Sequence, residues 1–119
     1  MPCSRIPKWS VRPYQSPGNA LVAYSGGTLT GAFGSDASRW DEYIESQNRI
    51  AKAAAAAGAT VLLSNHSEYD NAYTKARLIA AKREVGENHP FVVGADGVQR
   101  YFTVMTECAT ASKLRAGAK

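Results

Sequence analysis

The side chains best suited to chemistry lie in the stretch VLLSNHSEYD, residues 61–70, where an apolar run ends and a histidine meets carboxylates. This histidine, His66, is one of only two in the chain, and neutral imidazole is the commonest metal ligand in proteins. A catalytic zinc ion needs about three protein ligands and an open position. No H-x-H motif, H-E-x-x-H motif or cysteine pair supplies them. On the residues alone, His66 is either one member of a metal site or a loop side chain near a helix start.

The other candidate groups match no site motif. Gly26 and Gly27, followed by two further glycines, fit neither common phosphate-loop pattern, so they indicate a tight turn. His89 has no ligand partner at metal-site spacing. Cys3 and Cys108 form no C-x-x-C pair, and Cys108 falls on the apolar side of a helical pattern, where a small core residue is expected. No catalytic residue is therefore assigned.

Length and composition predict one small soluble globular domain. The chain has 119 residues, of which 45% are hydrophobic and 20% are charged. No apolar run approaches the roughly 18 residues that a membrane span needs, and the first residues lack an apolar signal segment, which favours the cytoplasm. The net charge of +4 comes largely from the two ends of the chain, without a basic stripe between them, so nucleic-acid binding is not expected.

Proline and glycine divide the chain into an arm and a domain. Four of the five prolines fall within residues 1–19, and proline fixes φ and removes a backbone donor, so this segment is predicted to be an irregular arm. Residues 20–119 are predicted to form a single α/β domain. Short apolar runs with turn signals behind them predict strands at residues 20–28 and 60–64.

Apolar residues at helical spacing predict three helices, at residues 39–57, 70–84 and 97–115. Ser38 and Asp41 approximate a capping box at the start of the first helix, and Gly58 provides its stop. Gly86 is the expected stop of the second helix, whose apolar residues lie on one face. Asp96 is the expected cap of the third.

Strands that alternate with helices predict an α/β fold of two or three strands with three helices. The possible third strand is the short extended segment HPFVVG, residues 89–94. Residues 60–64 are apolar on both faces, as in a parallel sheet, and ligands bind beyond the carboxyl ends of such strands. Residues 25–28 and 64–66 are expected to meet there. A sheet this narrow has unpaired edges, which predicts a homo-oligomer.

Three stretches together resemble the C-terminal part of metallo-β-lactamase-fold hydrolases, in the branch related to zinc β-lactamases. They are VAYSGGT, AAAAGATVLLSNHSEYDNA and HPFVVGADGVQRYFTVMTECA, within residues 20–112. The resemblance implies half of an αββα sandwich, and a parent class that uses zinc to hydrolyse amide, ester or thioester bonds. It places His66 at the family's last zinc histidine, and Gly27 near the position of a bridging aspartate that many members carry.

The chain also departs from this family. The H-x-H-x-D-H signature and the middle zinc histidine, which belong to the family's N-terminal half, are absent. We therefore expect a truncated or vestigial metallo-hydrolase, inactive as an isolated chain and without tightly bound zinc. Two other hypotheses stay open: a small non-catalytic α/β protein that self-associates, and a hydrolase that works without a metal.

Overall fold

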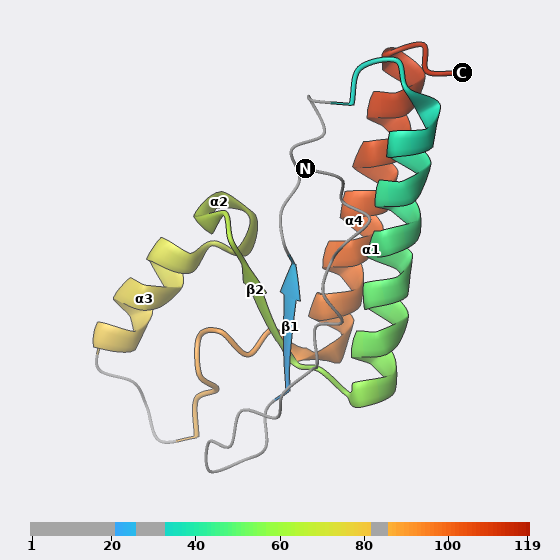
Figure 1. Cartoon of the computed structure of the whole chain (residues 1–119). Coiled ribbons are helices and arrows are strands. Elements are labelled where there is room, and N and C mark those ends of the chain that lie inside the picture. Colours follow the sequence, from blue (N-terminus) through green and yellow to red (C-terminus); the bar gives the residue numbers. More distant parts are fainter. Residues whose placement is uncertain (1–20, 26–32, 82–85) are drawn as a thin grey trace.

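The computed structural model describes residues 21–25, 33–81 and 86–119. In this part of the chain a two-stranded parallel sheet lies between a pair of long helices and a pair of short ones (Figure 1). The elements are β1 (Val22–Ser25), α1 (Ala37–Ala57), β2 (Val61–Ser64), α2 (Ser67–Asp70), α3 (Ala72–Ala80) and α4 (Gly94–Arg115). The predicted α/β class is confirmed.

The two strands run parallel because α1 carries the chain back along the sheet between them. Val22 pairs with Val61, and Ser25 pairs with Ser64 at the carboxyl ends. Each strand has four residues, and β2 begins one residue later than predicted. The register therefore brings the ends of β1 and β2 side by side, as the sequence predicts.

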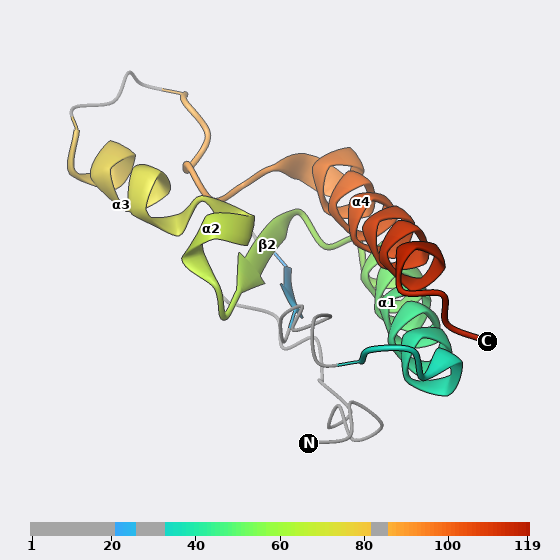
Figure 2. The ribbon, with the colours of Figure 1, turned by 90° about the horizontal axis from the view of Figure 1, so that it is seen from above.

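One face of the sheet and the α1–α4 pair enclose the main core, as the view from above shows (Figure 2). Ala23 and Leu62 project from the strands towards Ala54, Val98 and Phe102 on the helices. Ala54 is the buried member of the alanine run of α1, and its small side chain allows the two helices to approach closely. A second cluster, formed by Trp40, Tyr43 and Ala109 with their neighbours, fills the space between the far ends of the helices.

The start of α1 differs from the prediction. Asp36 is the N-cap, and its carboxylate accepts hydrogen bonds from the backbone N–H of Ser38 at 3.1 Å and from the Ser38 hydroxyl at 2.6 Å. The expected capping box of Ser38 and Asp41 is thus wrong, because Ser38 donates backwards to a better acceptor. The end of the helix agrees with the prediction: Gly58 adopts a left-handed conformation with φ of 68°.

The predicted helix at residues 70–84 is replaced by two shorter ones. Asn71 adopts a left-handed conformation with φ of 56°, which breaks the helical path between α2 and α3. α3 ends at Ala80, so Gly86 is not its stop. No residue of α3 is buried, and Tyr73 and Ile79 lie on the surface.

A contact between distant segments decides where α4 begins. The backbone N–H groups of Val93 and Gly94 donate to the carbonyl of Thr60, at 2.9 and 3.0 Å, so the helix starts beside β2. Asp96 is not the cap but lies in the first turn. Of the possible third strand, Val92 alone forms a bridge, antiparallel to Val61.

Cys108 is exposed, which corrects its predicted place in the core. The buried side of α4 consists of Val98, Phe102 and Ala109. Cys108 precedes Ala109 by one residue, or about 100° around a helix, and this turns it out of the buried side.

Several predictions concern segments outside the described residues. They are the arm at residues 1–19 with Cys3, the turn at Gly26 and Gly27, and residues 82–84 of the expected second helix.

Two valines of α4 provide a matched test of this core. Val98 is fully buried against the sheet, whereas Val104 on the same helix is 49% exposed. We expect Val98→Ala to lower the free energy of unfolding by about 2 kcal/mol, because it removes two buried methyl groups and leaves a cavity. Val104→Ala should change it by less than about 0.5 kcal/mol. Urea denaturation followed by circular dichroism measures both, and equal effects would contradict the assigned core.

Acid should weaken the start of α1. The hydrogen bond from the Ser38 hydroxyl is the main reason that the pKa of Asp36 lies below its ordinary value of 3.8. Because folding lowers this pKa, the ionised cap stabilises the fold above the unfolded-state pKa, and this contribution disappears as the pH falls through the folded-state pKa. We expect Asp36→Asn to keep the cap but to reduce the fall in Tm below about pH 4. Asp36→Ala should lower Tm at neutral pH as well. A thermal melt series from pH 7 to pH 2 measures this, and an unchanged acid response in Asp36→Asn would contradict it.

Candidate site at the carboxyl end of the sheet

The candidate site forms where the two parallel strands end together. Ser25 and Ser64 are the last residues of β1 and β2 and pair across the sheet. The next backbone N–H, that of Asn65, donates to the carbonyl of Ser25 at 3.4 Å, which extends the pairing by one step. His66 follows directly, so the structure places it at the end of the sheet where ligands bind in open α/β folds.

The backbone of His66 is held on both sides. Its N–H donates to the hydroxyl of Ser64 at 3.2 Å, and its carbonyl accepts from the N–H of Tyr69 at 3.1 Å. His66 occupies the N-cap position of α2, where its side chain makes no capping hydrogen bond. The imidazole meets the ring of Tyr69 edge to face, with 5.9 Å between the ring centroids. A partly exposed imidazole is thereby presented from a short, well-bonded loop.

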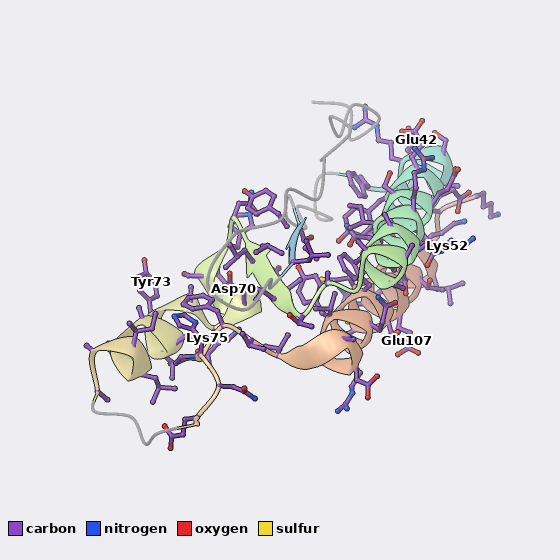
Figure 3. All side chains as sticks on the ribbon, turned by 90° about the horizontal axis from the view of Figure 1, so that it is seen from below. Glu42, Lys52, Asp70, Tyr73, Lys75 and Glu107 are labelled. Carbon is purple, nitrogen blue, oxygen red and sulfur yellow. The ribbon has the colours of Figure 1, made fainter. Side chains whose placement is uncertain are left out.

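Asp70 is a buried residue of this region that the sequence did not single out as a site candidate. It is only 4% exposed and lies where β2, α2 and α3 meet (Figure 3). One carboxylate oxygen, Oδ2, accepts from the backbone N–H of Ser64 at 2.7 Å. The other, Oδ1, accepts from the N–H of Ala72 at 2.9 Å. The sequence signal that could have pointed to Asp70 is its position just before an asparagine and a few residues beyond a predicted strand.

The second histidine makes a contact of a different kind. Nδ1 of His89 accepts the backbone N–H of Phe91 at 3.3 Å, and the two rings stack with their centroids 5.9 Å apart. Lys75 on α3 places its ammonium 5.4 Å from the centroid of the Phe91 ring. His89 thus helps to hold the loop before α4 against α3, and it forms no metal-ligand cluster with His66.

The described residues do not form a zinc site by themselves. Within residues 21–25, 33–81 and 86–119, no group of three or more His, Cys, Asp or Glu side chains is close enough to hold a metal ion. Both oxygens of Asp70 already accept backbone N–H groups, and Glu68 is exposed and accepts from the hydroxyl of Ser67. His66 is left as a single imidazole, whereas catalytic zinc requires about three protein ligands.

A buried hydroxyl adds a second unusual group at this end of the sheet. Ser25 is fully buried, and in the described part of the chain its Oγ has no hydrogen-bond partner. An unpaired buried polar group costs roughly 1–3 kcal/mol. The sequence predicts a polar strand end at this position but does not show that the hydroxyl is unsatisfied.

Comparison with protein families, with curated proteins and with solved structures finds no match for the chain. In the described residues, no helix combines the length and apolar character needed to cross a membrane.

Because the described part of the chain gives the imidazole no cluster of companion ligands, we expect the isolated chain to retain much less than one zinc ion per molecule after dialysis. Elemental analysis measures the content, and His66→Ala should leave it unchanged. Sedimentation must accompany the measurement, since an oligomer could bring two copies of His66 together. About one zinc per chain, lost in His66→Ala but retained in His89→Ala, would show that ligands outside the described residues complete a site.

Proposed function

We propose that the chain is the C-terminal part of a metallo-β-lactamase-fold hydrolase and contributes His66 as one metal ligand. One observation carries the proposal: a partly exposed imidazole stands at the carboxyl end of two parallel strands, in a loop whose backbone is fixed. Such a loop is suited to presenting a ligand, because a metal site needs its side chains held close to one geometry.

The resemblance to the family supports this proposal. The stretch around His66 runs from the end of α1 through β2 into the beginning of α3. The HPFVVGADGVQRYFTVMTECA stretch leads into α4, whose start is bonded to β2. The two stretches are separate in sequence, yet they meet at Thr60 and at the Val61–Val92 bridge.

The proposed activity belongs to an assembled protein and not to this chain alone. In the parent class, bound zinc supplies an activated water for the hydrolysis of amide, ester or thioester bonds. Without a complete set of ligands, water keeps its pKa of about 15.7, and little hydroxide is present at neutral pH. The contribution of this chain is therefore to hold one imidazole and to form one layer of the fold, and the remaining ligands come from an N-terminal layer.

A second candidate, a non-catalytic protein that self-associates, is favoured by the surface of α3. Tyr73 is 73% exposed, Leu78 51% and Ile79 41%, all on a nine-residue helix without a buried residue. These side chains point in different directions around the helix, so a partner could cover part of this exposed apolar surface. This candidate predicts a stable homodimer that persists when an N-terminal half of a metallo-β-lactamase-fold hydrolase is added.

An experiment that adds an N-terminal half to the chain distinguishes the two candidate functions. We expect the chain to have negligible activity on a chromogenic β-lactam or ester, with or without added zinc. Mixing it with separately expressed N-terminal halves of metallo-β-lactamase-fold hydrolases, each carrying H-x-H-x-D-H, should produce zinc-dependent turnover with at least one half. His66→Ala should reduce that turnover about 100-fold or more, because a direct ligand is lost and even residues supporting a ligand are worth 10–100-fold.

His89→Ala is the matched control, because it removes the chain's other imidazole from a loop with a structural contact. It should leave the restored turnover within a few-fold of the original. Turnover by the isolated chain that survives a chelator and His66→Ala would instead support a metal-independent hydrolase. A stable dimer by sedimentation that neither binds nor is activated by any N-terminal half would support the second candidate.

A further inference from the structure

Asp70 binds a backbone N–H group on the outer edge of β2, the edge that faces away from β1. The N–H groups of Val61 and Asn65 donate towards β1, to the carbonyls of Leu21, just before the strand, and of Ser25, at its end. Neighbouring residues of a strand point their N–H groups to opposite sides, so the N–H of Ser64 points away from β1. The sheet offers that group no partner, and the carboxylate of Asp70 accepts it at 2.7 Å.

The second oxygen of the same carboxylate binds the far end of the loop. After Asp70 the chain turns at Asn71, in a left-handed conformation, and the N–H of Ala72 at the start of α3 donates to Oδ1 at 2.9 Å. Asp70 thus joins the end of β2 to the beginning of α3 through one buried side chain (Figure 3). Hydrogen bonds to an ionised carboxylate are about twice as strong as neutral ones.

His66 lies inside the segment that these two bonds close. Its own bonds, to the Ser64 hydroxyl and from the Tyr69 N–H, are both local, and the second belongs to a helix of a single turn. A single helical turn is not stable alone in water, because nucleation costs more than one hydrogen bond returns. The conformation of His66 therefore depends on bonds that tie the turn to its neighbours, and Asp70, the last residue of the turn, makes them to Ser64 and Ala72.

We infer that Asp70 is a positioning residue, which fixes the backbone of residues 64–72 and thereby the direction in which His66 presents its imidazole. This inference rests on the proposed function in one respect: the proposed function supplies the metal ion that the positioned imidazole would bind. The alternative is that Asp70 only stabilises the beginning of α3, and in that case His66 should be indifferent to its removal.

The test is Asp70→Asn in the full-length chain, observed by amide hydrogen exchange and NMR. Asparagine has the same shape, but only one of its two terminal atoms accepts, so one backbone N–H would face an NH₂ group. We expect the amides of Ser64, His66, Tyr69 and Ala72 to exchange at least about tenfold faster, given the loss of a charge-assisted bond. The nuclear Overhauser contacts between the rings of His66 and Tyr69 should weaken at the same time.

Glu68→Gln is the matched control, because it removes one negative charge from the same loop without touching a backbone bond. It should leave exchange at all four amides unchanged. Faster exchange confined to Ala72 and α3 in Asp70→Asn, with His66 and Tyr69 unaffected, would overturn the inference. Faster exchange throughout α1 and α4 would overturn it too, because Asp70 would then support the whole fold and not one loop.

A spectroscopic measurement in the assembled protein keeps this inference separate from the proposed function. If an N-terminal half restores metal binding, Co²⁺ should give a visible spectrum whose bands broaden or shift in Asp70→Asn and not in Glu68→Gln. An unchanged Co²⁺ spectrum in Asp70→Asn would overturn the positioning role while leaving the proposed function intact. If no half restores binding, the proposed function fails, and the exchange of His66 in the isolated chain still decides whether Asp70 positions it.

Discussion

The parallel pairing of β1 with β2 is the interaction on which the candidate site depends, because its register sets Ser25 beside Ser64 at one end of the sheet. Parallel pairing requires the chain to return along the whole sheet, and α1 makes that return. The same helix then supplies Ala54 and its neighbours to the core against α4. The site, the crossover and the core are consequences of one pairing.

Among the described residues, metal binding at the site is limited by the small number of ligand side chains. The loop that carries His66 is itself well formed. His66 has both backbone groups bonded, and the segment around it is closed by a buried carboxylate. The buried hydroxyl of Ser25, which has no hydrogen-bond partner among the described residues, lies at the same end of the sheet.

The surfaces by which the chain can meet another layer are also constrained. At one end of the outer edge of β2, the carbonyl of Thr60 accepts from Val93 and Gly94, and at the other end Asp70 takes the N–H of Ser64. Covered strand ends are a common protection against unwanted pairing. α3 lies on the opposite side of the sheet from the α1–α4 pair (Figure 2), and none of its residues is buried. Its apolar side chains are therefore the more available contact surface.

The sequence by itself determined the α/β class, the two parallel strands, the end of α1 at Gly58 and the place of His66 at a strand end. Each follows from local signals: the spacing of apolar residues, a glycine suited to a left-handed stop and an apolar run that ends in polar residues. These signals act over a few residues and need no partner elsewhere in the chain, so a single sequence carries them in full.

Only the tertiary structure decided where α4 begins, why Cys108 is exposed and what Asp70 does. α4 begins where Val93 and Gly94 reach the carbonyl of Thr60, more than 30 residues earlier in the chain. Cys108 lies one residue away from the buried side of its helix, and the direction of that side is set by the sheet it packs on. Asp70 resembles any loop carboxylate until the fold brings the N–H groups of Ser64 and Ala72 to its two oxygens. Hydrogen-bond partners are a property of three-dimensional distance, and a sequence pattern records only separation along the chain.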